Sequence, residues 1–318
     1  MKNLLKVLLS AAACAALPLG ALFGETFVSD SPRPIDLSKF RQGGIYENLI
    51  TNFGIPYKTA DDEILRFDIS YPKGPVPEGG FPLAVYIHGG AWVGGERFSG
   101  YGYFNDEIRH YNSKGIAVAS VTYRFARGSN PARGMDVCVA DCMDALRFMT
   151  KHARTLMINP KKIGVYGHSA GGHLAFMAAL ADQSLFPGDP SLEGVKYEIA
   201  CAVPQSGPVA FTRIQPVNPG LYKVLFGGRG DAFKEMLSPL NYMGKKCPPM
   251  LILQGDRDDL VPVEGAREIY EKGRAAGAPV ELVVSENARH SFEDAKNPDN
   301  DRLADIRRAF FVRHLAGE

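Results

Sequence analysis

Short runs of apolar and β-branched residues alternate along the chain with longer segments whose apolar residues recur every three or four positions. The short runs predict β-strands over residues 64–71, 83–87, 116–123, 163–166, 199–205, 250–254 and 280–285. The longer segments predict helices over residues 101–114, 135–153, 171–183, 263–276 and 301–316. The central runs lack polar alternation, which is typical of strands with helices on both faces of their sheet. The pattern therefore predicts an α/β fold with a doubly wound, mostly parallel sheet.

Two segments interrupt this alternation. Residues 25–60 have no regular pattern, and we expect them to form an N-terminal extension or partial cap that wraps the edge of the sheet. Residues 206–248 are the longest interval without a strand pattern, and their scattered aromatic residues predict a lid-like insertion over the strand ends. The remaining pattern is expected to belong to one α/β domain, residues 61–318.

Composition narrows the function classes. The chain has 318 residues, of which 45% are hydrophobic, so it can bury one large core or two small ones. The net charge is +1 and no basic run stands out, which argues against nucleic acid as a partner. After residue 24 no apolar run is long enough to cross a bilayer, so stable membrane insertion is not expected once residues 1–24 are removed.

The first 24 residues differ from the rest of the chain. Lys2 and Lys6 precede a long run of Leu and Ala, and small residues follow, which predicts a cleaved secretory signal peptide. A membrane anchor and a lipoprotein cut before Cys14 are the alternatives; the apolar run continues past Cys14, which favours the signal peptide. We therefore expect an exported protein, periplasmic or secreted.

Four cysteines remain after such a cleavage: Cys138, Cys142, Cys201 and Cys247. Export would permit disulfides, but these scattered cysteines do not resemble the framework of a small stapled domain. Cys138 and Cys142 stand four apart in a helical pattern, and no further His or Cys completes a zinc site beside them. Buried free thiols are the favoured interpretation, and no metal site is predicted.

The sequence GHSAG at residues 167–171 stands where a strand pattern turns directly into a helix pattern. A serine in such a turn is lifted above the carboxyl edge of a parallel sheet, and the flanking glycines avoid steric clashes. The following helix adds backbone N–H groups and the positive end of its dipole. Ser169 is therefore the predicted nucleophile, and His168 beside it is a candidate residue of the substrate pocket.

A serine nucleophile needs a base, and the base needs an acid to orient it. After the predicted strand 280–285 comes His290, the only histidine between residues 174 and 313. After strand 250–254 come Asp256, Asp258 and Asp259, of which Asp258 is the favoured acid and the other two are expected to shape the turn. Each group follows a strand, so the sheet would bring them to the same edge as the serine.

The sequence YIHGGAWVGGE at residues 86–96 contains the end of the predicted strand 83–87 and the glycine-rich segment after it. Gly89 and Gly90 would allow bare backbone N–H groups to approach the reaction centre, and with the N–H of Ala170 they predict an oxyanion hole. His88 is another tentative pocket residue, although ordering of the loop is the more favoured role. Trp92 lines the substrate pocket or is buried beneath the loop; the sequence leaves both open.

The motifs HGGAW, GHSAGGHLA, GDRDDLVP and RHSF, in this order, resemble the α/β-hydrolase superfamily from about residue 60 to the end. The loop H-G-G-[GA]-[WF] is similar to that of its esterase/lipase group. This resemblance implies a sheet of about eight strands. Hormone-sensitive-lipase relatives have a long N-terminal cap domain, but residues 25–60 look too short and irregular for one, so we expect a short lid and no large cap domain. The family acid of G-x-x-D-x-x-V-P maps onto Asp258, while Ser291 stands where the family often has Gly after the histidine.

Further segments, RFDISYP, VTYRFA and the stretch around the serine, look similar to bacterial carbohydrate esterases of the xylan acetyl and feruloyl branch. The resemblance implies a serine carboxylic-ester hydrolase that works through an acyl-enzyme and needs no metal or organic cofactor. The expected substrate is a small ester or an esterified oligosaccharide or polysaccharide, with acetyl or feruloyl as the acyl group. Alternatives are an arylformamidase or a small exopeptidase of the same fold, or a non-catalytic hydrolase-like binding module.

Overall fold

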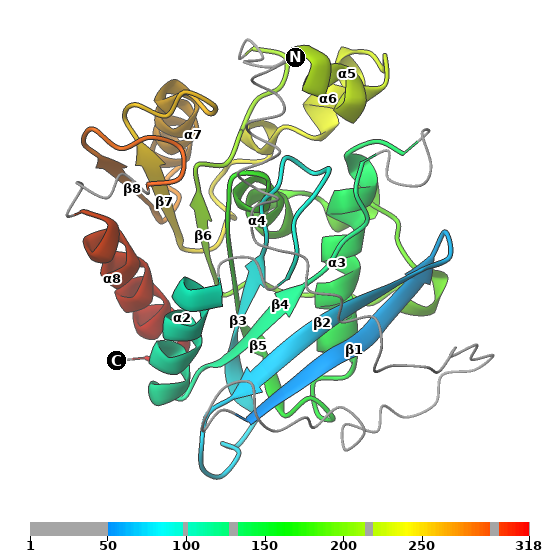
Figure 1. The fold of residues 1–318 in the computed structure, drawn as a ribbon, viewed down its shortest axis with the longest axis vertical. Helices are drawn as coiled ribbons and strands as arrows, with labels where there is room; N and C mark the ends of the chain where they lie inside the picture. Colours follow the sequence, from blue (N-terminus) through cyan, green and yellow to red (C-terminus); the bar gives the residue numbers. More distant parts are fainter. Residues whose placement is uncertain (1–49, 98–100, 127–132, 214–218, 293–298, 318) are drawn as a thin grey trace.

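An eight-stranded sheet forms the centre of the part of the chain that the structure describes. The structure is a computed structural model that describes residues 50–97, 101–126, 133–213, 219–292 and 299–317 (Figure 1). The predicted signal peptide and residues 25–49 of the extension lie outside these ranges. The strands are β1 (Ile50–Ala60), β2 (Glu63–Tyr71), β3 (Phe81–Ile87), β4 (Ala117–Val121), β5 (Ile158–His168), β6 (Cys201–Gln205), β7 (Met250–Gly255) and β8 (Val280–Ser285).

The strand order is β1-β2-β4-β3-β5-β6-β7-β8. Strand β2 pairs antiparallel with both β1 and β4, and every other neighbouring pair is parallel. The four strands β3, β5, β6 and β7 at the parallel centre consist almost entirely of buried residues where they pair. The predicted doubly wound, mostly parallel sheet is confirmed.

Strand β1 corrects one prediction. Residues 25–60 were expected to be irregular, but residues 50–60 form a strand at the sheet edge. Gly54 and Pro56 interrupt the alternation of apolar and polar residues, and the β1–β2 pairing shifts register beside both of them. A glycine and a proline are tolerated in an edge strand that contains bulges, so the strand forms without the usual sequence pattern.

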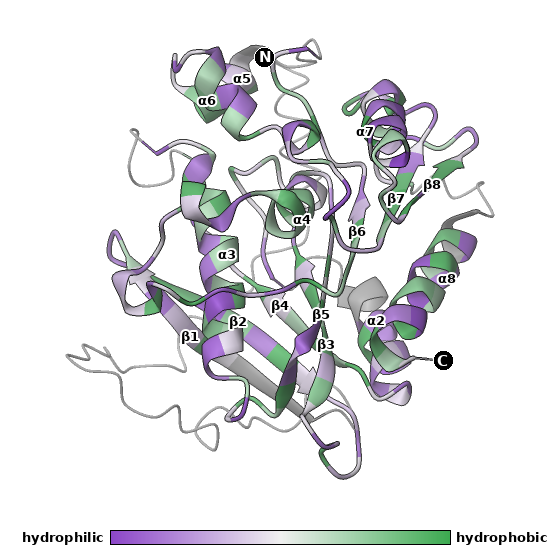
Figure 2. Ribbon diagram, turned by 180° about the vertical axis from the view of Figure 1, so that it is seen from behind, coloured by the Kyte–Doolittle hydropathy of each residue, from purple (hydrophilic) through white to green (hydrophobic). Residues whose placement is uncertain are grey.

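Helices cover both faces of the sheet. Helices α2 (Tyr101–Ser113) and α8 (Asp299–Phe311) contact one face, and α8 continues into a π-helical turn, Val312–Ala316. Helices α3 (Asp136–Lys151), α4 (Ala170–Leu180) and α7 (Val263–Ala275) contact the other face (Figures 1 and 2). In Figure 2, α3 and α8 carry both hydrophilic and hydrophobic residues, as expected for helices with one side on a sheet.

The segment 206–248 contains two short helices, α5 (Pro219–Phe226) and α6 (Asp231–Met236), and a 3₁₀ turn, Pro239–Asn241. The ring of Phe211 in this segment makes edge contacts with the rings of Trp92 and His173 outside it and with that of Phe226 within it. Its role as a lid stays a prediction. Within the described ranges, no helix combines the length and the apolar character that crossing a bilayer requires.

Candidate active site

Ser169 lies in the one-residue turn between β5 and α4. Its backbone has φ 60° and ψ −122°, a positive-φ conformation that is strained for a residue with a side chain. The Ser169 N–H donates to the carbonyl of Gln205 on β6 (2.9 Å), which ties the turn to the neighbouring strand. Gly171 is required here, because a Cβ at this position would collide with the carbonyl oxygens of Ile87 and His88. This strand–turn–helix is the geometry of a nucleophile elbow.

The structure brings the three predicted catalytic side chains together. His290 Nε2 lies 2.8 Å from Ser169 Oγ, and His290 Nδ1 lies 2.8 Å from Asp258 Oδ2 and 3.0 Å from Oδ1. The three residues follow β5, β7 and β8, so all stand at the carboxyl edge of the parallel strands. Asp256 and Asp259 are exposed, whereas Asp258 is 8% exposed.

Asp258 is held as a carboxylate. Its Oδ1 accepts hydrogen bonds from the N–H groups of Leu260 (2.9 Å) and Val261 (2.8 Å), and Gln254 Nε2 donates to Oδ2 (3.0 Å). Burial alone would raise the pKa of Asp258, but the hydrogen bond and charge of His290 and these N–H groups outweigh it, so the pKa lies below its usual value. An ionised Asp258 can stabilise a positive charge on the His290 ring.

The loop after β3 lies directly against the nucleophile. A Cβ built on Gly89 would lie 3.5 Å from the Cβ of Ser169 and 2.8 Å from the His168 carbonyl oxygen, so only a glycine lets the backbone approach so closely. The next non-glycine residues, Ala91 and Trp92, have φ of 54° and 59°. Backbone strain of this kind concentrates at functional sites. The structure thus places the backbone of one predicted oxyanion donor beside Ser169, while Ala170 is the first residue of α4.

Gly90 holds the same loop in a conformation that a side chain would not allow. Its φ is +109°, and a Cβ there would collide with the Gly94 carbonyl oxygen. The Val93 N–H donates to the Gly90 carbonyl (3.1 Å), which closes the turn. The donor role of Gly89, Gly90 and Ala170 towards an oxyanion belongs to the proposal below.

His88 does not line a substrate pocket, so this tentative prediction is wrong. The side chain is 1% exposed and stacks on the ring of Tyr123 with the centroids 4.3 Å apart. Its Nδ1 lies 2.7 Å from the Gly89 carbonyl oxygen, and the Tyr123 hydroxyl donates to the carbonyl of His88 (2.9 Å). His88 therefore orders the loop, which was the alternative that the sequence favoured.

Trp92 is buried beneath the loop, the second of its two predicted roles. It is 4% exposed, and its Nε1–H donates to His173 Nδ1 (3.1 Å). The other ring nitrogen of His173 must then carry the proton, and it donates to the carbonyl of Leu237 (2.8 Å) in the 206–248 segment. His173 thus connects the glycine loop, the helix after the nucleophile and the insertion.

Sequence reasoning missed His173 and Tyr123. His173 stands one helical turn after Ser169, with its N–H donating to the serine carbonyl (3.0 Å), so its spacing was an available signal. Burial lowers the pKa of both His173 and His88 to about 4, so both rings are neutral at neutral pH. His168, the third tentative pocket residue, is partly buried with its ring against His290 at a centroid distance of 4.8 Å.

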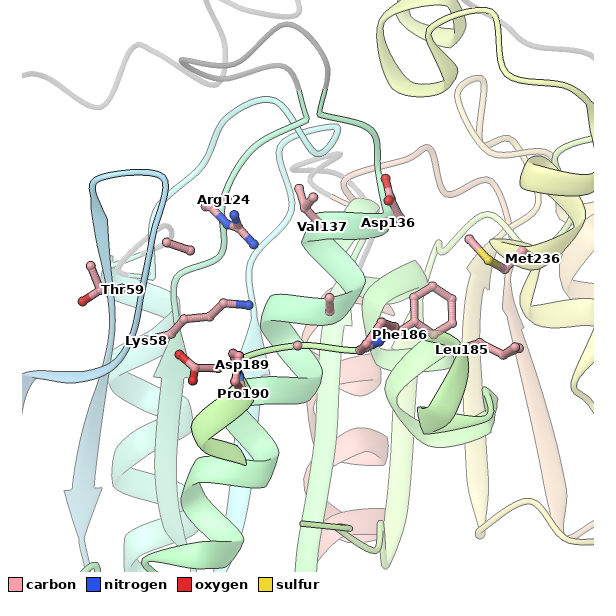
Figure 3. Close-up of a pocket in the computed structure, with 14 residues that line it drawn as sticks. Lys58, Thr59, Arg124, Asp136, Val137, Leu185, Phe186, Asp189, Pro190 and Met236 are labelled. Carbon is pink, nitrogen blue, oxygen red and sulfur yellow. The ribbon is translucent and has the colours of Figure 1, made fainter. Parts of the chain in front are cut away.

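A second group of buried charges lies beside α3. We call it the α3 network: Lys58, Arg124, Asp141, Asp144 and Arg147. Lys58 extends from β1 towards α3 beside a cavity of about 350 Å³ (Figure 3). None of the residues that line this cavity belongs to the Ser–His–Asp group. Both carboxylates of the network are paired with its cations, and Arg124 also pairs with Asp61 outside it, so the network has the character of a structural element.

Three of the four cysteines outside the signal segment, Cys138, Cys142 and Cys201, are buried and unpaired, as predicted, and Cys247 is partly buried and also unpaired. Burial raises the pKa of the Cys201 thiol to about 12, so this thiol is unreactive at neutral pH. Among the described residues there is no cluster of three or more His, Cys, Asp or Glu side chains arranged to bind a metal.

Residues 67–272 match the protein-family model BD-FAE. The chain belongs to the BD-FAE family. A probable carboxylic ester hydrolase of Mycobacterium tuberculosis, LipM, is 28% identical over an alignment of 225 residues that covers 67% of this chain and 49% of LipM. Esterase LipQ of the same organism is 26% identical over 262 residues, 75% of this chain and 56% of LipQ. This BD-FAE member thus spans about half the length of these curated relatives.

Solved structures agree with the family assignment. The propionate-bound esterase 2 of Thermogutta terrifontis superposes with a TM-score of 0.68 at 26% identity, covering 81% of this chain and 92% of that one. The α/β-hydrolase fold and the resemblance to its esterase/lipase group are therefore confirmed for this BD-FAE member. The closer resemblance to xylan acetyl and feruloyl esterases stays a prediction.

Proposed function

We propose that this protein is a serine carboxylic-ester hydrolase that works through an acyl-enzyme. One observation carries the proposal: Ser169 Oγ, both ring nitrogens of His290 and the carboxylate of Asp258 form a continuous hydrogen-bonded chain with links of 2.8 Å, starting at a strained elbow. The same arrangement of nucleophile, base and orienting acid activates a serine hydroxyl in unrelated folds. The esterase relatives support this class of reaction.

The proposed reaction has two halves. In the first, His290 Nε2 takes the proton of Ser169 as Oγ attacks the ester carbonyl, and Asp258 stabilises the imidazolium. The proton then passes from Nε2 to the departing alcohol, which leaves an acyl-Ser169. In the second half, His290 deprotonates a water molecule that attacks the acyl group, and the carboxylic acid departs as the serine recovers its proton.

Negative charge develops on the carbonyl oxygen in both halves. The N–H groups of Gly89, Gly90 and Ala170 are the proposed donors to this oxyanion. Gly89 supports the assignment because its backbone lies against Ser169. Each such donor contributes about 3–4 kcal/mol to transition-state stabilisation in well-studied acyl-transfer enzymes.

We extend the proposal to acetyl or feruloyl esters of polysaccharides, with export as the predicted location. The support is the resemblance of RFDISYP and VTYRFA to carbohydrate esterases and the exported character of residues 1–24. Structures of the Thermogutta terrifontis esterase hold propionate or butyrate, which shows that a related fold accepts short carboxylates. A small acyl group is therefore compatible with the architecture.

The test compares the release of acetate from acetylated xylan, of ferulate from feruloylated arabinoxylan and of nitrophenol from p-nitrophenyl acetate. N-Formylkynurenine and an aminoacyl anilide serve as arylformamidase and peptidase substrates. A fluorophosphonate probe should label the wild type and a Ser191→Ala control, which removes an exposed serine, but not Ser169→Ala. Absence of both labelling and ester hydrolysis would reject the proposal in favour of a binding module.

A further inference from the structure

His290 stands in a short segment between β8 and residue 292, which we call the base loop (residues 286–292). Backbone hydrogen bonds between described residues hold this loop at two points beside His290. The Arg257 N–H donates to the carbonyl of Ala288 (3.0 Å), and the Phe292 N–H donates to that of Arg289 (3.2 Å). A catalytic base needs an accurate position, since a displacement of about 1 Å can reduce a rate about 100-fold.

His168 contacts the backbone of the base itself. Its Nε2 lies 2.7 Å from the carbonyl oxygen of His290. A carbonyl oxygen only accepts hydrogen bonds, so His168 Nε2 carries the proton and donates it. The ring of His168 also lies 4.8 Å from that of His290 and 6.3 Å from that of Phe292, measured between centroids.

Two consecutive residues therefore hold the base at two points. The hydroxyl of Ser169 contacts the ring of His290, and the ring of His168 contacts its backbone carbonyl. The contacts of the ring with Ser169 and Asp258 hold the imidazole but not the backbone of the loop, whereas the bond from His168 to the His290 carbonyl fixes the distance between that backbone and the elbow. His168 is itself anchored, since it ends β5 opposite Gln205 of β6.

We propose that His168 is a positioning residue that fixes the base loop to the nucleophile elbow through its Nε2–H bond to the His290 carbonyl. The inference rests on the proposed function, since it assigns a task within the same site. It replaces the tentative role of His168 as a pocket residue. His168 itself touches neither the Ser169 hydroxyl nor the carboxylate of Asp258 in any described contact, so its effect must pass through His290.

The protonation state agrees with this geometry. Desolvation and the neighbouring His290 ring lower the pKa of His168 to about 4. At neutral pH the ring is uncharged and carries a single proton. Because Nε2 donates to the His290 carbonyl, this proton is on Nε2. A neutral His168 also avoids repulsion when His290 gains the proton of the serine.

Two variants of similar length separate the hydrogen bond from the volume of the side chain. His168→Met removes the donor, and we expect kcat for p-nitrophenyl acetate to fall about 10- to 100-fold with KM changed less than about threefold. His168→Gln offers an amide N–H near the position of Nε2, and we expect it to restore kcat to within about fivefold of the wild type. Equal kcat values for the two variants would overturn the proposal, as would a His168→Met variant with wild-type kcat.

A measurement on the wild type covers the case in which the Met variant does not fold. The ¹⁵N shifts of the His168 ring, assigned by their loss in His168→Gln, should show the neutral Nε2–H form at pH 7. A ring protonated on Nδ1 alone would overturn the proposal. If the wild type neither hydrolyses esters nor reacts with the fluorophosphonate, the proposed function fails, whereas the ring signals still report on the hydrogen bond itself.

Discussion

The Ser–His–Asp site and the α3 network both bury carboxylates against positively charged or ionisable side chains, yet they are built differently. In the α3 network, Asp141 contacts Lys58 (2.7 Å) and Arg124 (2.8 Å), and Asp144 contacts Lys58 (2.6 Å) and Arg147 (2.8 Å). Each carboxylate is thus shared by two cations, and the chain of contacts ends at both sides in a guanidinium group, that of Arg124 and that of Arg147, which is no nucleophile.

In the Ser–His–Asp site, the carboxylate of Asp258 meets a histidine whose second nitrogen faces a hydroxyl. The chain of contacts therefore ends in a reactive group. This site also contains strained backbone at Ser169, Ala91 and Trp92, whereas the two carboxylates of the network lie within the regular helix α3. The comparison teaches that buried charge alone does not identify an active site. A cavity does not identify one either, since the cavity of about 350 Å³ lies beside the α3 network and not beside the Ser–His–Asp site.

Among the variants that distinguish the two regions, Asp258→Asn should have the largest effect, a loss of kcat. The amide cannot hold His290 in the required tautomer or stabilise its charged form, so we expect kcat to fall about 10⁴-fold, as in other triads. The unfolding midpoint in urea should change little by comparison, since the amide retains the size of the side chain. Steady-state kinetics and a urea titration measure the two quantities.

Asp259→Asn is the matched control, because Asp259 is exposed, adjacent and of the same chemical type. It should leave kcat within about twofold. If the Asp259 variant loses activity and the Asp258 variant keeps it, the assignment of the acid is wrong.

Much of this site could be predicted from the sequence because its signals are local. The elbow is specified by five consecutive residues, and the acid and the base each follow directly after a strand whose pattern is plain. The α3 network could not be predicted, since Lys58 and Asp141 are far apart in sequence and only the packing of β1 against α3 pairs them. Strand β1 was missed for a related reason: its pairing with β2 overrides the weak strand signal left by Gly54 and Pro56.

The tentative pocket residues show the other limit of sequence reasoning. A motif places His88 and Trp92 near the reaction centre, but it does not state on which side of the loop a side chain lies. Burial against Tyr123 and His173 decides this, and both partners are remote in sequence. Residue type gave no indication either, because histidine and tryptophan occur both in cores and in pockets.

The second prediction breaks the α3 network. Asp141→Asn leaves Lys58 and Arg124 facing each other across a neutral amide, so we expect the free energy of unfolding to fall by about 3–5 kcal/mol. The kcat of the remaining folded enzyme should stay within about twofold, since no catalytic group contacts Asp141 in the described structure. Chemical denaturation and active-site titration with a fluorophosphonate measure the two effects.

The control is Arg213→Met, which breaks the exposed ion pair with Glu268 (2.8 Å). Exposed pairs contribute about 0–1 kcal/mol, so this variant should remain close to the wild type. A loss of kcat in Asp141→Asn as large as that in Asp258→Asn would remove the distinction between the two regions.

The third prediction concerns Trp92, which is buried and stands in the same loop as the proposed oxyanion donors Gly89 and Gly90. Trp92→Phe keeps an aromatic ring but removes the N–H that His173 Nδ1 accepts. An unsatisfied buried acceptor costs about 1–3 kcal/mol of stability. Since Trp92 stands in the loop of Gly89 and Gly90, we also expect kcat to fall about three- to tenfold. A loss of stability with unchanged kcat would show that the Tyr123–His88 contacts are sufficient to hold the loop.

The smallest expected effect is a difference in pH dependence. The pKa of the buried His173 is lowered to about 4, below the usual 6.5, so the unfolded chain binds more protons than the folded protein between pH 4 and 6.5. This residue therefore contributes stability that is fully present above about pH 6.5 and is lost as the pH falls towards 4. The α3 network has no histidine and lacks this contribution.

His173→Gln removes the titrating ring and retains an amide that can donate to the Leu237 carbonyl. From pH 7 to pH 5.5, the wild type should lose about 1 kcal/mol more unfolding free energy than this variant. Urea titrations of one protein alone would report all titrating groups together. Subtracting the unfolding free energies of the two proteins at each pH cancels the contributions of the groups that they share. If the unfolding free energies of both proteins change in parallel with pH, the folded protein accepts a charged His173. The link from Trp92 through His173 to Leu237 would then not depend on a neutral ring.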